Sequence, residues 1–143
     1  MKAIIIKSDK ALSYEFVPDP EVKADDILIK VKAAGVNRAD LLQREGKYPS
    51  PAGSPDWMGL DVAGTVEKMG ETAKMQSSLK IGDSVCALLG GGGYAEYVST
   101  RYDMFLPLPE GFDFEHGACI PEVRSEEHTS ELQSQHHISY AVF

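Results

Sequence analysis

The sequence has 143 residues and a formal net charge of −8, and hydrophobic residues make up 43% of it. This length is enough for one domain with a hydrophobic core but short for the two-domain layout of most nucleotide-dependent enzymes. The acidic charge argues against a nucleic-acid or anionic-membrane partner, and no apolar run is long enough to span a bilayer. The composition therefore predicts a soluble, cytoplasmic protein.

Short β-rich segments, punctuated by glycine and proline, follow one another along the chain. Apolar and polar residues alternate, or form strand-sized apolar runs, and they predict strands at 2–7, 12–17, 26–34, 60–69, 79–89 and 94–99. Pro18 and Pro20 end the second segment, because proline cannot donate to a strand ladder. Many short strands with glycine at the corners predict a small barrel, closed or partly open.

Two segments have helical features. Residues 37–45 predict a helix with Asn37 as its cap and Gly46 as its stop, and residues 113–123 begin a second one. Between the first helix and the fourth strand, residues 48–59 are irregular and stiffened by three prolines. Cys86 and Cys119 stand alone, without metal-ligand spacing, and are predicted to be buried thiols in a reducing compartment.

The apolar patterning and the glycines stop near Val123. Residues 124–134 and 138–143 resemble the translated ends of a standard sequencing-library adapter, and residues 135–137 stand where its variable index would be. The hypothesis is that residues 1–123 form the natural domain. Residues 124–143 would then be a non-native, poorly ordered tail, comparable to the scar of a gene fusion.

Four ordered motifs carry a family resemblance: AAGVNRADLLQREGKYP, GLDVAGTVEKMG, KIGDSVCALLGGGGYAEYV and LPLPEGFDFEHGACIPE. Together they resemble the catalytic domain of quinone oxidoreductases in the medium-chain dehydrogenase/reductase superfamily. Their residue patterns are most similar to those of the tumour-suppressor-inducible subgroup. The resemblance implies a mainly β fold with short helices, arranged as a GroES-like, partly open barrel. In such families a Rossmann domain that binds NADPH follows, and it is missing here, so the domain at 1–123 is expected to be incomplete.

The resemblance also implies a function. The parent protein is expected to be a zinc-independent reductase that uses NADPH to transfer hydride to a small quinone or enone, and to form a homodimer or larger homo-oligomer. The 143-residue chain alone is expected to be inactive. The alternatives are an enoyl or enone double-bond reductase and a non-catalytic GroES-like binding module.

No metal is predicted. Zinc members of the superfamily carry cysteine where Asn37 stands, and histidine followed by glutamate where Leu60 and Asp61 stand. Leucine cannot coordinate a cation, and a catalytic zinc needs about three protein ligands.

Two residues are the candidates for function. The family places an amide at Asn37 near the nicotinamide and its ribose, although capping the helix is an equal explanation. The family also places a tyrosine at Tyr48 in the active site, where a phenol could donate a proton; the alternative is an aromatic plug over the prolines.

Four other features have structural explanations. Arg38 and Asp40 are expected to pair on the surface or across the helix, and Asp61 is expected to anchor its loop. The glycine run at 90–93 could bind phosphate, but a flexible turn is favoured because a strand-like segment follows it. His116 is expected to be a surface or packing residue.

Overall fold

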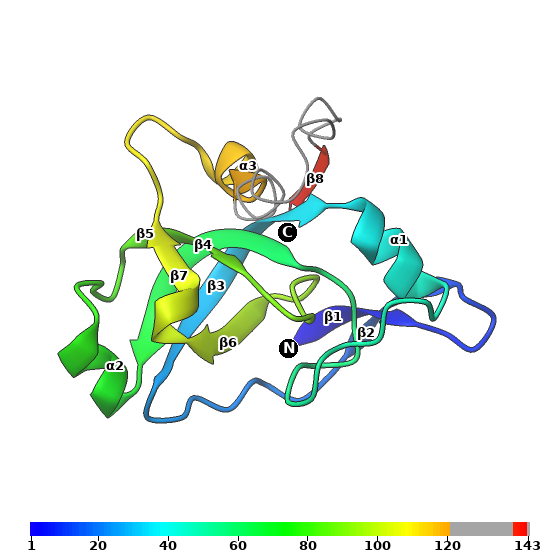
Figure 1. Ribbon diagram of the computed structural model, residues 1–143, viewed down its shortest axis with the longest axis horizontal. Helices are drawn as coiled ribbons and strands as arrows, with labels where there is room; N and C mark the ends of the chain where they lie inside the picture. Colours follow the sequence, from blue (N-terminus) through cyan, green and yellow to red (C-terminus); the bar gives the residue numbers. More distant parts are fainter. Residues whose placement is uncertain (121–138, 143) are drawn as a thin grey trace.

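The computed structural model describes residues 1–120 and 139–142 of the chain, which is mainly β (Figure 1). Its strands are β1 (Lys2–Ile6), β2 (Leu12–Phe16), β3 (Asp26–Val36), β4 (Asp61–Met69), β5 (Ser84–Leu88), β6 (Tyr97–Arg101), β7 (Phe105–Pro107) and β8 (Ser139–Val142). Its helices are α1 (Arg38–Arg44), α2 (Glu71–Gln76), the single 3-10 turn η1 (Tyr102–Met104) and α3 (Phe114–Gly117).

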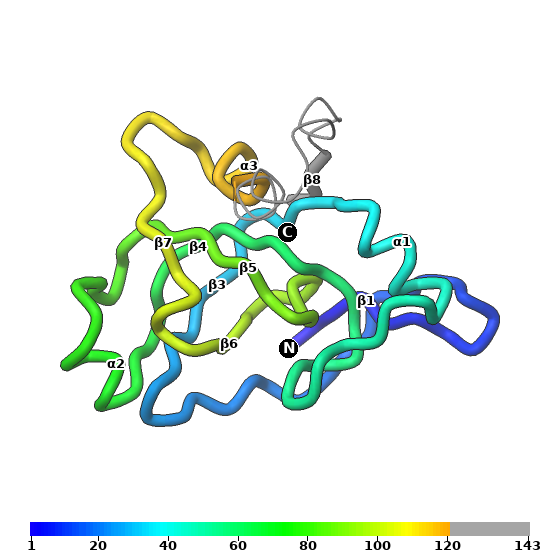
Figure 2. Tube along the Cα trace, in the orientation of Figure 1, coloured from blue at the N-terminus to red at the C-terminus, as the bar shows by residue number. Residues whose placement is uncertain are grey.

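The long strand β3 organises the larger sheet, whose order is β6-β3-β4-β5-β7. One edge of β3 pairs antiparallel with β4, and its other edge pairs first with β6 and then with β8. Strands β1 and β2 form a separate hairpin, joined to the segment before β6 by a bridge between Ala3 and Ala95. Figure 2 shows the hairpin and α2 at opposite ends of the molecule.

The core lies along one face of this sheet because alternate residues of β3 and β4 point inward. Ile27, Ile29 and Val31 are at most 3% exposed, and Val62 and Val66 face them from β4. A second, smaller cluster of small buried side chains lies beneath α3, with Leu108 and Phe114 packed against it; its members are Ala33, Ala63, Cys86 and Ala118. The two described cysteines are buried, as predicted.

The predicted architecture is confirmed: the domain is mainly β with short helices, and its larger sheet does not close, since β6 and β7 end it. Within residues 1–120 and 139–142, no helix is long and apolar enough to cross a bilayer.

Several predicted boundaries differ from the structure. The strand predicted at 79–89 is confined to β5, because residues 80–83 form a turn in which Asp83 accepts a hydrogen bond from the Lys80 amide at 2.9 Å. The strand predicted at 94–99 begins only at Tyr97, and α3 covers four residues of the helix predicted at 113–123. Helix α2 and strand β7 were not predicted.

The predicted boundary at Val123, and most of the predicted tail, lie outside the described residues. Four residues of that tail are described: Ser139–Val142 form β8 and pair antiparallel with the last residues of β3, Ala33 to Val36 (Figure 1). Their backbone therefore has a defined partner.

Candidate functional site

Asn37 lies where β3 ends and α1 begins. Its backbone is extended, with φ −119° and ψ 162°, so the chain turns into the helix at the next residue. The Asn37 backbone N–H donates to Asp40 Oδ2 at 2.7 Å, which is the reciprocal contact of a capping box. Asn37 is thus the helix cap, as predicted, and its side-chain amide completes the capping box on the side of the Asp40 backbone N–H.

That amide contacts Asp61, the first residue of β4. Asn37 Nδ2 donates to Asp61 Oδ2 at 2.9 Å, and Asp61 is fully buried. The ends of the two strands can approach because Gly35 has no side chain: a Cβ there would stand 3.1 Å from the Asp61 Cβ and 2.8 Å from the Ala118 carbonyl oxygen. The prediction that Asp61 anchors its segment by hydrogen bonding is confirmed, and the partner it anchors is Asn37.

The predicted surface pairing of Asp40 with Arg38 is wrong. Asp40 is 0% exposed and points inward, where Oδ2 accepts from the hydroxyl of Tyr94 at 3.0 Å as well as from Asn37. The Tyr94 hydroxyl also lies 3.1 Å from the carbonyl oxygen of Gly35. Sequence reasoning missed Tyr94, because only the fold brings it beside a residue 54 positions away.

Burial sets the electrostatics of this group. Desolvation raises the pKa of Asp40, although hydrogen bonds from Asn37, Tyr94 and Gly59 act against the shift. Burial, and then the nearby Asp40 carboxylate, raise the pKa of Tyr94 well above its usual value. Burial and the charge of Asp61 raise the pKa of the Cys119 thiol to about 11. Tyr94 and Cys119 therefore stay protonated at neutral pH.

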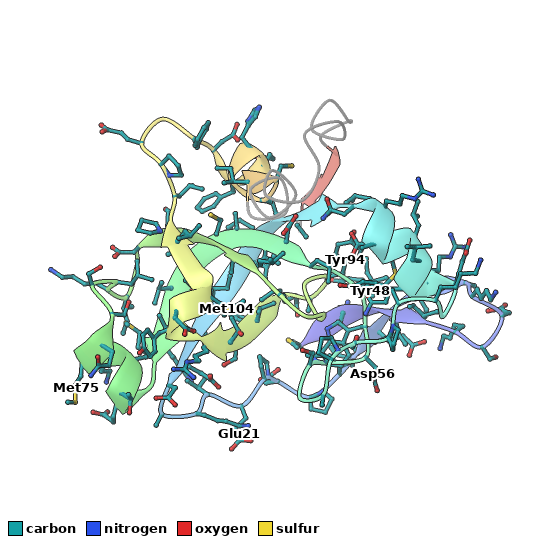
Figure 3. All side chains as sticks on the ribbon, viewed as in Figure 1. Glu21, Tyr48, Asp56, Met75, Tyr94 and Met104 are labelled. Atoms are coloured by element: carbon teal, nitrogen blue, oxygen red, sulfur yellow. The ribbon has the colours of Figure 1, made fainter. Side chains whose placement is uncertain are left out.

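Tyr48 lies in the segment that follows α1, and its side chain is 40% exposed. Figure 3 places Tyr48 and Tyr94 in the half of the molecule that holds α1, far from Met75 on α2. The structure thus leaves Tyr48 partly accessible to solvent. The role of Tyr48 as a proton donor stays a prediction.

The glycine run at 90–93 is a packed turn rather than an open, flexible one. Gly91, Gly92 and Gly93 are buried beneath the proline-rich segment, and the Gly92 amide donates to the Trp57 carbonyl oxygen at 2.8 Å. A Cβ on Gly90 would stand 2.5 Å from Ser54 Oγ. The run has no side chains because the neighbouring segment fills that space, and β6 rather than a helix follows it, which disfavours phosphate binding.

One smaller expectation concerns the last described helix. His116 is a surface residue, as predicted: its ring is 63% exposed and lies 2.6 Å from the Asp113 carboxylate, which also caps α3. Asp113 therefore supports α3 rather than a metal site.

At Asn37, Leu60 and Asp61, where the family resemblance places the ligands of zinc-dependent members, the side chains do not offer the donor set of a catalytic zinc. The Asn37 amide presents its N–H group to Asp61, and Leu60 offers no donor atom. Among the described residues, no three His, Cys, Asp or Glu side chains gather closely enough to hold a metal ion. The donor chemistry does not fit a catalytic zinc.

Comparison with known proteins gives three consistent results. Residues 23–110 match the family described as the alcohol dehydrogenase GroES-like domain. The chain is 44% identical over 102 residues to a quinone oxidoreductase of Sus scrofa, covering 71% of this chain and 30% of that protein. It is 32% identical over 130 residues to the trans-enoyl reductase pydC of Acremonium sp, covering 83% of this chain and 36% of that protein.

Solved structures agree with the sequences. The quinone oxidoreductase of Thermus thermophilus, solved alone and in complex with NADPH, is similar with a TM-score of 0.65 and 33% identity, over 85% of this chain and 37% of that one. The chain spans about a third of the length of the relatives it matches.

Proposed function

The chain belongs to the family of alcohol dehydrogenase GroES-like domains, and from this premise we propose that it is the catalytic domain of a reductase that uses NADPH to reduce quinones without zinc. Its homologues are quinone oxidoreductases and trans-enoyl reductases. Because the chain spans about a third of their length, the activity of the whole protein is part of the proposal.

The contact between Asn37 and Asp61 carries this proposal. It replaces the ligands of zinc-dependent relatives with a fixed amide, which can hold a nicotinamide ring but cannot polarise a carbonyl as a metal does. NADPH, when bound, supplies the hydride. The chain's own residues then have two tasks, which are to orient the nicotinamide and to provide a proton.

Asn37 orients the ring, and the phenol of Tyr48, a residue that is 40% exposed, donates the proton to the reduced acceptor. The surroundings of the Asn37 amide fit the first task. Asp61 holds one side of it, and the partial exposure of Asn37 leaves the other side accessible to a ligand.

Saturation-transfer NMR on the purified chain tests the proposal, since it detects millimolar binding and needs no turnover. With NADPH, we expect saturation on the nicotinamide and its ribose, and less on the adenine. Asn37→Ser is the matched variant, because serine keeps a capping oxygen but removes the amide. Saturation confined to the adenine, or none at all, would contradict the proposal, and one zinc retained per chain after dialysis would contradict zinc independence.

An enoyl reductase is the second candidate, favoured by the trans-enoyl reductase relatives. The same hydride chemistry serves both acceptors. Competition for the chain between 1,4-naphthoquinone and an α,β-unsaturated ketone, read from the saturation of each, distinguishes them. Stronger saturation of the ketone would favour the enoyl reductase.

A further inference from the structure

The hydrogen bond to Asp61 fixes the orientation of the Asn37 amide. Asp61 Oδ2 accepts from Nδ2 at 2.9 Å, so the N–H₂ end of the amide faces Asp61. The carbonyl oxygen Oδ1 then faces away from Asp61, on the side of the Asp40 backbone N–H, and its two lone pairs leave it able to accept from a ligand as well. Without Asp61, the two ends of the amide could exchange places.

Both partners are held rigidly. Asp61 is fully buried at the start of β4, where it is in register with Leu88 of β5. The backbone of Asn37 is tied to Asp40, whose carboxylate is in turn held by Tyr94. A side chain that is fixed at its backbone and at one end of its amide loses little entropy on binding a ligand.

We propose that Asp61 is a positioning residue: it orients Asn37 so that Oδ1 accepts a hydrogen bond from the nicotinamide riboside end of the cofactor, whose donors are the carboxamide N–H and the ribose hydroxyls. This inference rests on the proposed function. It assigns to Asp61 a role in specificity for a hydrogen-bond donor, and it explains why a buried carboxylate stands behind a half-buried amide.

The pair offers a reciprocal exchange as a test. In Asn37→Asp with Asp61→Asn, the new amide at 61 donates to the new carboxylate at 37, and a carboxylate oxygen still faces the ligand. Asp61→Leu removes the acceptor and leaves the Asn37 amide unfixed. Asn37→Asp alone places two carboxylates in contact, which the buried site disfavours.

Selective labelling makes the measurement direct, because Asn37 is the single asparagine of the 143-residue sequence. In the chain labelled with ¹⁵N-asparagine, one side-chain N–H₂ pair is expected, with one proton shifted downfield by the carboxylate. In the exchanged variant the single pair reports on residue 61. Titration with NADPH, followed on these signals and on the ligand, gives the dissociation constant of each variant.

The proposal expects the exchanged variant to bind NADPH within about threefold of the original chain, and Asp61→Leu to bind about tenfold more weakly, which corresponds to about 1.4 kcal/mol. Asp103→Asn, an exposed residue paired with Arg101, is the control and should not change the affinity. Thermal unfolding of each variant separates a loss of positioning from a loss of folding.

Two results would overturn the inference. A folded Asp61→Leu chain that binds as tightly as the original shows that Asp61 does not position Asn37. A folded exchanged variant that binds no better than Asn37→Asp alone shows the same, even where Asp61→Leu fails to fold. If the original chain shows no response to NADPH, the proposed cofactor site fails, and the positioning role fails with it.

Discussion

The junction between β3 and α1 and the hairpin β1–β2 contain the same kinds of side chain in opposite surroundings. Tyr94 is 6% exposed at the junction, whereas Tyr14 is 53% exposed on the hairpin. Asp40 is fully buried and accepts from Asn37 and Tyr94, whereas Glu15 pairs with Lys7 at the surface. Burial and partners, rather than residue type, therefore decide what each group contributes.

The two carboxylates titrate in opposite directions for this reason. Burial raises the pKa of Asp40 because the charged form loses its hydration. Hydrogen bonds from Lys7 and Ser13 lower the pKa of Glu15, which keeps its hydration. The junction is thus a rigid, polar and costly arrangement of the kind found at functional sites, while the hairpin tolerates change.

Removal of the Asp40 carboxylate should have the largest effect. Asp40→Ala removes the carboxylate that accepts from the Asn37 amide and the Tyr94 hydroxyl, and it opens a cavity beneath α1. We expect a loss of about 3 kcal/mol in the free energy of unfolding, measured with urea. Glu15→Ala on the hairpin is the control and should lose far less, because its ion pair is exposed. Equal losses in the two variants would contradict the comparison.

Removal of one hydroxyl should have a smaller effect. Tyr94→Phe keeps the ring but removes the hydrogen bond to the Asp40 carboxylate, and we expect a loss of about 1.5–2 kcal/mol. Tyr14→Phe should lie within about 0.5 kcal/mol of the original chain, because its hydroxyl belongs to an exposed side chain. Urea unfolding of both variants measures the difference, and a stabilised Tyr94→Phe would show that the hydroxyl is dispensable.

The hairpin could be predicted from the sequence, but the junction could be predicted only in part. Alternation and strand-sized apolar runs located β1, β2, β3 and β4, and Asn37 was identified as a cap because capping is local. The contact of Asp40 with Tyr94 spans 54 residues, so no local pattern indicates it.

Other differences also arise from contacts distant in the sequence. Residues 94–96 have a strand-like pattern but bond to two partners: the Tyr94 carbonyl oxygen accepts from the Ile4 amide of β1 at 2.8 Å, and the Glu96 carbonyl oxygen accepts from the Val31 amide of β3 at 2.9 Å. The glycine run at 90–93 has no helix or strand period. Glycine is needed there because the proline-rich segment that covers the run leaves no space for side chains. Helix α2 had a local signal that was missed: Gly70 as cap, Glu71 in the first turn and Lys74 in the last.

The pH dependence of stability separates the two carboxylates by sign. Asp40 has a raised pKa in the folded protein, so it stabilises the fold fully below its unfolded pKa, and this contribution is lost as the pH rises toward the folded value. The free energy of unfolding that Asp40→Asn loses relative to the original chain should therefore become smaller from about pH 4 upward, by at most about 1.4 kcal/mol per pH unit.

Glu15 should behave in the opposite way. Its pKa is lowered in the folded protein, so its contribution is present above the unfolded pKa of about 4.5 and is lost as the pH falls. The free energy of unfolding that Glu15→Gln loses relative to the original chain should become larger between about pH 3 and about pH 6. Urea unfolding at four or five pH values measures both series, and slopes of the same sign would show that the two sites do not differ in the way proposed.

The exposed aromatic residues of β2 should show the smallest effect. Phe16 is 81% exposed, and Lys2 lies 5.1 Å from its ring centroid. Phe16→Ser removes this contact and some β propensity, but it leaves no cavity and no buried polar group, so we expect a change of less than about 0.5 kcal/mol. Urea unfolding gives the number. A loss of unfolding free energy as large as that of Tyr94→Phe would contradict the comparison. It would mean that the Phe16 side chain contributes as much to stability as the buried Tyr94 hydroxyl does, which an exposed ring cannot do.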